Sequence, residues 1–209
     1  MRLLRTLPGL ALLLTPAVLA QAPRSAISNC GLLASQVLNC PRFDFTYKIP
    51  FGWVDRTNEM DRPDDREAKD STIRESVRPE TLLAIFERPP GAPGETIDSA
   101  VVIAAEPLAN YPQVKKASDY FGPITELAEK GGFKAEGEPY AISIGAKQFV
   151  RADFSKPRGN LTMYQSSLAV IENGYIVSFT FVAGGEEEVE ELVSNLQFAG
   201  SGRKRPPNH

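Results

Sequence analysis

The chain has almost no histidine. Its single histidine, His209, is the last of 209 residues. Without an internal imidazole, the usual Ser-His-Asp and Cys-His catalytic groups cannot form, and a zinc site lacks its common nitrogen ligand. There is also no P-loop, and no G-x-G-x-x-G segment opens a helix after a strand. We therefore predict no catalytic residues, no cofactor and no metal site.

Cysteine is scarce as well, because Cys30 and Cys40 are the only two. They do not form a C-x-x-C motif and have no histidine nearby, which disfavours a metal or redox pair. A structural disulfide is the better interpretation for an exported chain. The GLLASQVLN segment between them could form about two helical turns. We expect the disulfide to join the N-terminal segment, residues 23–42, to the strand that begins at Phe43.

Long hydrophobic runs are absent after the first 22 residues. Arg2 and Arg5 precede an apolar run over residues 7–20, and an A-x-A site follows at residues 20–22. This layout predicts a cleavable secretory signal over residues 1–22, cut after Ala20 or Ala22. The alternative, a membrane anchor, is disfavoured because the run is shorter than the roughly 20 residues that span a bilayer. We expect a periplasmic or extracellular protein with no integral membrane span.

Positive charge is in slight deficit, and the formal net charge is −3. A protein that binds nucleic acid needs a basic face to neutralise phosphates, so nucleic acid is not an expected partner. The exception is residues 200–209, where Arg203, Lys204 and Arg205 stand among Gly and Pro. We predict that this basic tail is disordered, with weak contact to an anionic surface as the alternative.

The first clear strand pattern alternates aromatic or branched residues with polar ones over residues 43–49. It places Phe43, Phe45, Tyr47 and Ile49 on one face, which should be buried against a helix. Pro50 and Gly52 then predict a turn. The following Trp53 is the only tryptophan, and it is either a plug at the edge of the core or the anchor of a ligand or partner surface.

Residues 55–79 contain many charges of both signs and few large apolar side chains. Such a segment buries too little surface to offset its ordering entropy, so we predict a charged loop. Asp61, Asp64 and Asp65 could suggest calcium, but their spacing is not that of the twelve-residue calcium loop.

The middle of the chain combines buried strands with one covering helix. Short apolar runs at residues 82–86 and 100–104 are typical of strands covered on both faces, so helices should lie on both sides of the sheet. Apolar residues at three and four residue spacings predict a helix over residues 114–128. Gly122-Pro123 should kink it or divide it into two abutting helices.

The last third of the sequence predicts an antiparallel meander of three strands followed by a helix. Strands are expected at residues 146–155, 161–171 and 175–182, with the Asn-Gly at 173–174 as the hairpin signal. A helix should begin at the acidic run 186–191. These acids suit a helix N-terminus better than a metal site.

Several segments together resemble the PsbP-like family. They are F-x-Y-x-I-P-x-G-W at residues 45–53, GGF at 131–133, ISIGAKQFVRADF at 142–154 and SNLQF at 194–198. The resemblance implies an α+β fold over residues 43–199, an antiparallel β-sheet sandwiched between helices (α/β/α), which a Ran-binding transport factor and bacterial envelope proteins share. It also implies a non-catalytic binding or assembly role, and it transfers no functional residue.

One strand carries the best candidate site. Alternation places Arg151 and Asp153 on the same face, where they could form a small anion site with Tyr164 or Ser166 of the neighbouring strand. They could instead form an ion pair that bridges sheet and helix. The sequence thus predicts an exported, non-catalytic binding protein whose partner is an envelope protein or a small ligand. The alternative is a small hydrolase or lyase that uses carboxylates, with Arg151 as its anion anchor.

Overall fold

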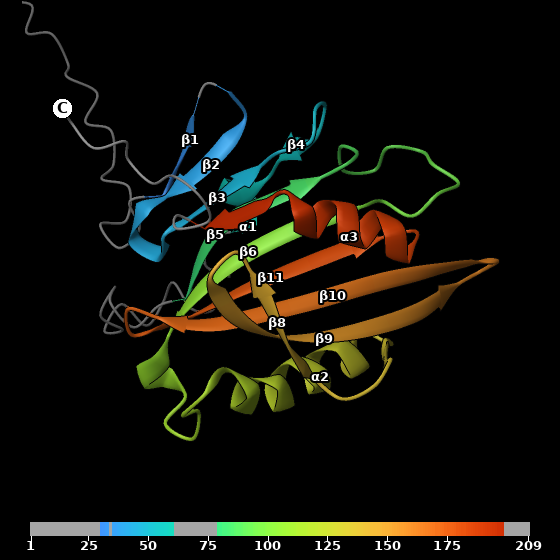
Figure 1. Ribbon diagram of the computed structural model, residues 1–209. Coiled ribbons are helices and arrows are strands. Elements are labelled where there is room, and N and C mark those ends of the chain that lie inside the picture. Colours follow the sequence, from blue (N-terminus) through green and yellow to red (C-terminus); the bar gives the residue numbers. More distant parts are fainter. Residues whose placement is uncertain (1–29, 34, 61–78, 199–209) are drawn as a thin grey trace, which may run out of the picture.

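The computed structural model describes residues 30–33, 35–60 and 79–198, and its centre is an eight-stranded antiparallel sheet (Figure 1). Along the sheet the strands follow the order β4-β5-β6-β11-β10-β9-β7, and β8 also pairs with β9. Their bounds are β4 (Val54–Asp55), β5 (Glu80–Phe86), β6 (Ala100–Pro107), β7 (Lys134–Ala135), β8 (Tyr140–Ile144), β9 (Lys147–Arg158), β10 (Leu161–Glu172) and β11 (Tyr175–Ala183).

The predicted meander is confirmed as β9, β10 and β11. At the turn between β10 and β11, Asn173 and Gly174 have φ values of 50° and 80°. Both are in the left-handed region that a tight two-residue hairpin requires, which explains the Asn-Gly pair. The turn between β9 and β10 is shorter than expected, because β9 continues through Arg158 and only residues 159–160 separate the two strands.

A second, four-stranded sheet lies over one face of the main sheet (Figure 1). It contains β1 (Gly31–Leu33), β2 (Val37–Cys40), β3 (Phe45–Lys48) and β12 (Leu196–Phe198) in the order β1-β2-β3-β12. The helices are α1 (Thr57–Met60), α2 (Phe121–Lys130) and α3 (Glu186–Ser194), with 3-10 turns at Pro41–Phe43, Leu108–Asn110 and Ala117–Tyr120.

The predicted sandwich is confirmed: α2 covers one face of the main sheet, and α3 lies on the other face beside the small sheet (Figure 1). The prediction of purely helical layers was incomplete, because β1, β2, β3 and β12 form part of the second layer. The rings of β3 therefore face the main sheet as well as a helix. Tyr47 packs against Phe181 of β11 and donates its hydroxyl to the backbone oxygen of Leu192 in α3 at 3.1 Å.

The predicted disulfide between Cys30 and Cys40 is confirmed, but the helix between them is not. β1 and β2 form a hairpin in which Leu33 pairs with Val37, and Gln36 adopts a left-handed φ of 57° at the turn. β2 also pairs with β3. Pairing on both sides satisfies the backbone of β2, so tertiary contacts override its weak helical preference.

The first predicted strand begins two residues later than expected. Phe43 belongs to a 3-10 turn, and Asp44 has a left-handed φ of 60° before β3 starts. Even so, Phe43, Phe45 and Tyr47 are all buried, as the alternation predicts. The turn at Pro50 and Gly52 is present, since Gly52 has φ 84° and the Trp53 amide donates to the Pro50 oxygen at 3.4 Å.

The helix expected over residues 114–128 is divided into two abutting parts, but the division lies before Phe121 and not at Gly122-Pro123. A 3-10 turn at Ala117–Tyr120 leads into α2, which begins at Phe121. Pro123 therefore stands in the first turn of α2, where a backbone N–H has no helical partner, and it does not break a hydrogen bond.

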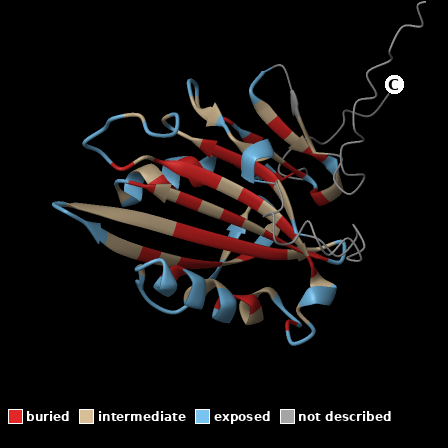
Figure 2. Ribbon diagram, turned by 180° about the vertical axis from the view of Figure 1, so that it is seen from behind, coloured by how far each residue is buried: buried red, intermediate tan, exposed pale blue. Residues whose placement is uncertain are grey.

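The main core lies between the two sheets and is rich in phenylalanine. Phe45, Phe149, Phe179 and Phe198 form a cluster in which contacting ring centroids lie 5.1–6.4 Å apart. Figure 2 shows that buried residues follow the central strands, whereas exposed residues gather at loop tips and along the outer side of α2. A smaller core, which includes Phe121, lies between α2 and the main sheet.

Three predictions concern segments outside the described residues. These are the signal at residues 1–22, most of the charged loop and the basic tail at residues 200–209. Of the charged loop, residues 55–60 are described and form the end of β4 and the short helix α1. The domain boundaries stay predictions.

Candidate functional site

Four elements bring polar side chains together beside β9. Arg151 and Asp153 lie two residues apart on β9 and share one face, as predicted. Ser166 of β10 is the cross-strand partner of Asp153, and Tyr140 of β8 is that of Arg151. Glu190 approaches from α3, which packs over β10 and β11.

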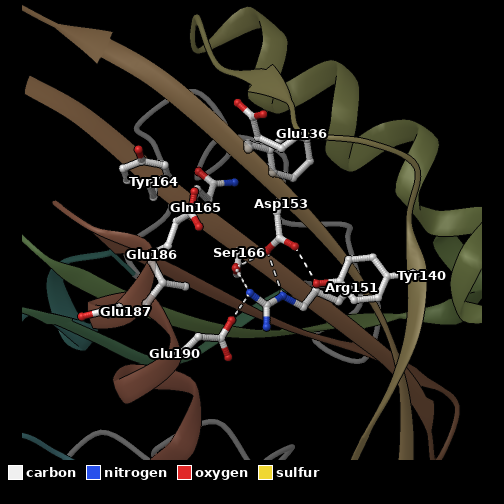
Figure 3. Close-up of a pocket in the computed structure, with 12 residues that line it drawn as sticks. Glu136, Tyr140, Arg151, Asp153, Tyr164, Gln165, Ser166, Glu186, Glu187 and Glu190 are labelled. Carbon is white, nitrogen blue, oxygen red and sulfur yellow. Dashed lines mark hydrogen bonds and ion pairs between the residues drawn. The ribbon is translucent and has the colours of Figure 1, made fainter.

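Arg151 is the centre of this network (Figure 3). Its Nε lies 2.8 Å from Asp153 Oδ1, and its Nη2 donates to Ser166 Oγ at 2.8 Å and to Glu190 Oε1. Ser166 in turn donates its hydroxyl to Asp153 Oδ1, and Tyr140 donates to Asp153 Oδ2 at 2.7 Å. Arg151 is only 9% exposed, so its charge is compensated almost entirely by these neighbours.

Three groups of the network, Asp153, Tyr140 and Arg151, have shifted pKa values that keep them in their ordinary charge states. Burial acts to raise the pKa of the Asp153 carboxyl, but hydrogen bonds from Ser166, Tyr140 and Arg151 outweigh it and lower that pKa. Burial and the hydrogen bond to Asp153 raise the pKa of Tyr140 to about 12. Burial opposes the charge of Arg151, but the hydrogen bonds to Glu190 and Asp153 raise its pKa further. All three pKa values therefore move away from neutrality.

The network forms one wall of a cavity of about 410 Å³ between α3, β9 and β10. Figure 3 shows most of its lining. The lining residues are Glu136, Tyr140, Arg151, Asp153, Phe154, Tyr164, Gln165, Ser166, Glu186, Glu187, Val189 and Glu190. The volume falls in the usual range for small-ligand sites, and the lining combines aromatic rings with a few converging polar groups, as such sites do.

The structure brings three of the four predicted surface residues together. Arg151, Asp153 and Tyr164 line the same cavity. Trp53 is not among its lining residues. It is half-buried and packs against the main core, which fits the interpretation as an edge plug. The contacts match the ion-pair interpretation of Arg151, because its guanidinium bridges β9 and α3 through Asp153 and Glu190. Whether these residues bind a ligand stays a prediction.

Sequence reasoning missed Glu190 and Tyr140, the other two partners in the network. Glu190 was assigned only to helix electrostatics, although Glu186 and Glu190 are four residues apart and therefore share one side of α3. That spacing could have indicated an acidic side facing the sheet. Tyr140 had no such signal, because the short strand β8 was not predicted.

A metal site is not apparent in the described part of the chain. Residues 30–33, 35–60 and 79–198 contain no group of three or more His, Cys, Asp or Glu side chains placed to hold an ion. The aspartates at residues 61, 64 and 65 lie outside these ranges. Among the described helices, none has the length and apolar character needed to cross a bilayer.

The raised pKa of Tyr140 predicts a loss of stability in alkali. This pKa is about 12 in the folded protein, against an ordinary value of 10.0, so folding favours the protonated phenol. The resulting stability is present below pH 10 and is lost as the pH rises from about 10 to about 12. The Tyr140→Phe variant should therefore lose less stability over this range, as measured by urea unfolding at each pH. Identical alkaline profiles for the two proteins would contradict the role of Tyr140.

Comparison with solved structures found similar folds at low sequence identity. PsbP (CyanoP) of Synechocystis has a TM-score of 0.49 and 11% identity, covering 82% of this chain and 98% of that protein. LpqN of Mycobacterium tuberculosis, described as involved in cell envelope biogenesis, has a TM-score of 0.35 and 12% identity, covering 72% and 76%. The Ran-binding protein Mog1p of Saccharomyces cerevisiae has a TM-score of 0.38 and 10% identity, covering 83% and 86%.

These structures include a PsbP and a Ran-binding protein, the two groups to which the sequence resemblance pointed. Comparisons with protein-family models and with curated proteins found no match. No residue role passes to this chain from these proteins.

Proposed function

We propose that this chain is an exported, non-catalytic binding or assembly protein of the cell envelope, and that the cavity beside Arg151 is its binding site. The observation that carries the proposal is the Arg151 network, in which the guanidinium is paired with two carboxylates at the wall of an open cavity. Such a wall is held in place before any ligand arrives, which reduces the entropy lost on binding.

The pKa shifts favour binding over catalysis. A general acid or base works best with a pKa near the working pH. Here the pKa of Asp153 is lowered by its hydrogen bonds despite burial, and the pKa of Tyr140 is raised by burial and by its bond to Asp153. At neutral pH the first is a poor base and the second a poor acid, so neither is suited to proton transfer.

Two features support export. Structural disulfides such as Cys30–Cys40 occur mainly where the environment is oxidising, such as the periplasm or the outside of the cell. The secretory signal predicted at residues 1–22 would direct the chain out of the cytoplasm. Both features support export to the periplasm or the outside of the cell, and the proposed partner is an envelope protein or a small ligand.

The alternative of a carboxylate-dependent hydrolase or lyase has one observation in its favour, which is the concave shape of the site. It also requires Arg151 to hold an anionic substrate. Asp153 and Glu190 already neutralise this guanidinium, and Glu136, Glu186 and Glu187 add further negative charge to the lining. An anion would be repelled, so binding is the better supported function.

Site-directed photo-crosslinking in the cells that export the protein tests the proposal. A photoreactive amino acid at Tyr164, in the cavity lining, should give a discrete adduct. The matched position is Leu127 on α2, on the far face of the sheet, which is 73% exposed and should give none. Equal labelling from Tyr164 and Leu127, or none from Tyr164, would contradict a binding role for the cavity.

A further inference from the structure

A second cavity adjoins the Arg151 cavity along α3. It has a volume of about 600 Å³ and shares Glu187 with the first. Its lining residues are Glu87, Thr96, Ile97, Ser99, Leu161, Gly184, Gly185, Glu187, Glu188 and Glu191. The two cavities thus lie on either side of the N-terminal half of α3 and meet at one exposed carboxylate.

Carboxylates dominate the lining of both cavities. Eight carboxylates line the two cavities together. Arg151 is the single basic residue among the lining side chains. Arg151 is neutralised by Asp153 and Glu190. Glu186 and Glu187 are exposed and have no hydrogen-bond or ion-pair partner among the described residues. The combined surface therefore carries a strong excess of negative charge, which attracts cations and repels anions.

Helix electrostatics do not account for this arrangement. Acids in the first turn of α3 stabilise its N-terminus, and Glu186 and Glu187 contribute in this way. However, Glu87 follows β5, Glu136 follows β7 and Asp153 lies on β9. Carboxylates from four separate elements converge on the two cavities, although only α3 gains from the helix effect.

Aromatic rings in the Arg151 cavity suit an organic cation better than a hydrated ion. The rings of Tyr140 and Tyr164 are part of its lining. The Arg151 guanidinium already lies 6.0 Å from the centre of the Tyr140 ring, so this ring faces a cation in the structure. The aliphatic stem of a lysine or arginine can pack on such rings while its charged end reaches the carboxylates.

We propose that the ligand of this site is a basic peptide segment of a partner protein, whose lysine or arginine side chains enter both cavities. This inference rests on the proposed binding function and names its partner class. A small amine would occupy one cavity, whereas an extended peptide can place separate basic side chains on the two sides of Glu187. The shared negative charge supplies attraction and orientation, and the rings of the Arg151 cavity add contact area.

Binding of a fluorescein-labelled peptide that alternates lysine with serine tests the inference by fluorescence anisotropy. The full chain should bind it, and the affinity should fall as salt is added, because exposed charges are screened. In the Glu186→Gln/Glu187→Gln variant, affinity at low salt should fall about tenfold, since two exposed charge contacts are lost.

The matched control is Glu126→Gln/Glu129→Gln, which removes the same charge from exposed positions on α2. It should change the affinity less than about twofold, because α2 covers the opposite face. An equal loss in both variants would mean that only net charge matters and would overturn the inference. Normal unfolding curves for both variants establish that folding is not the cause.

Two further probes separate the peptide from other ligands. Spermidine should compete only weakly, and a peptide that alternates glutamate with serine should not bind. Saturation by spermidine with the affinity of the lysine peptide would assign the site to small polyamines and overturn the peptide proposal. An adduct at Tyr164 with a neutral or anionic molecule would overturn it too, while leaving the proposed binding function intact.

Discussion

Replacement of Phe179 by alanine is expected to lower the free energy of unfolding by about 4 kcal/mol, as truncations of buried phenylalanine commonly do. Phe179 is fully buried on β11 and contacts the rings of Phe45, Phe149 and Phe198. It thereby joins the main sheet to β3 and β12 of the small sheet. Its loss leaves a cavity at the junction of the two layers, which rigid strands on both sides cannot close.

Urea unfolding followed by circular dichroism measures this loss. Because about 4 kcal/mol is a large part of the stability of a typical domain, the milder Phe179→Leu variant should be measured beside it. Phe51→Ala is the matched control: Phe51 is 93% exposed at the turn after β3, and its loss should change stability by less than about 0.5 kcal/mol. Similar losses at Phe179 and Phe51 would contradict the assigned core.

Removal of the disulfide is expected to destabilise the protein by about 3 kcal/mol. The bond joins Cys30 and Cys40 across the β1–β2 hairpin, at a separation of 10 residues. In the chain-entropy description, a closed loop of this length restricts the unfolded chain by roughly that amount. Cys40 is also fully buried in the main core, so the small sheet loses its covalent tie and a packed sulfur.

The Cys30→Ala/Cys40→Ala variant, compared with the parent protein by urea unfolding, gives the size of this effect. A reducing agent should lower the stability of the parent protein and leave the variant unchanged, which separates the bond from the substitution. A count of free thiols in the unfolded, unreduced parent protein should give none. Two free thiols would show that the bond does not form in solution.

The strand pattern was predictable where both local rules and packing pointed the same way. The alternation around Phe45 and Tyr47 predicted which residues are buried, and these residues are buried. The Asn173-Gly174 pair predicted the hairpin between β10 and β11 because few other residues tolerate both left-handed φ values. α3 was predicted from its apolar stripe and its acidic first turn.

The small sheet was not predictable because its strands are short and gain their stability from one another. β1, β2 and β12 have three or four residues each, which is too few for a periodic signal. β12 joins β3 from the far end of the chain, and only the folded protein shows that pairing. The prediction of a helix between the cysteines was wrong because β2 is stabilised by pairing with β1 and β3.

The candidate site was half predictable. Alternation along one strand placed Arg151 and Asp153 on the same face, and the neighbouring strand offered Ser166. Glu190 and Tyr140 come from elements whose position beside β9 depends on packing. The carboxylates that line the two cavities are scattered from residue 87 to residue 191 of the chain. Their convergence therefore cannot be seen in the sequence.

The sequence alone determined the scarcity of histidine, the pair of cysteines available for a bond, and the alternation that decides which side chains are buried. These properties depend only on residue type and on spacing within one element. The tertiary structure decided which elements lie side by side, and therefore that Arg151 is neutralised by its neighbours while the rim of its cavity remains acidic. Charges act through space over several ångströms, so their combined effect depends on the folded arrangement and not on their order in the chain.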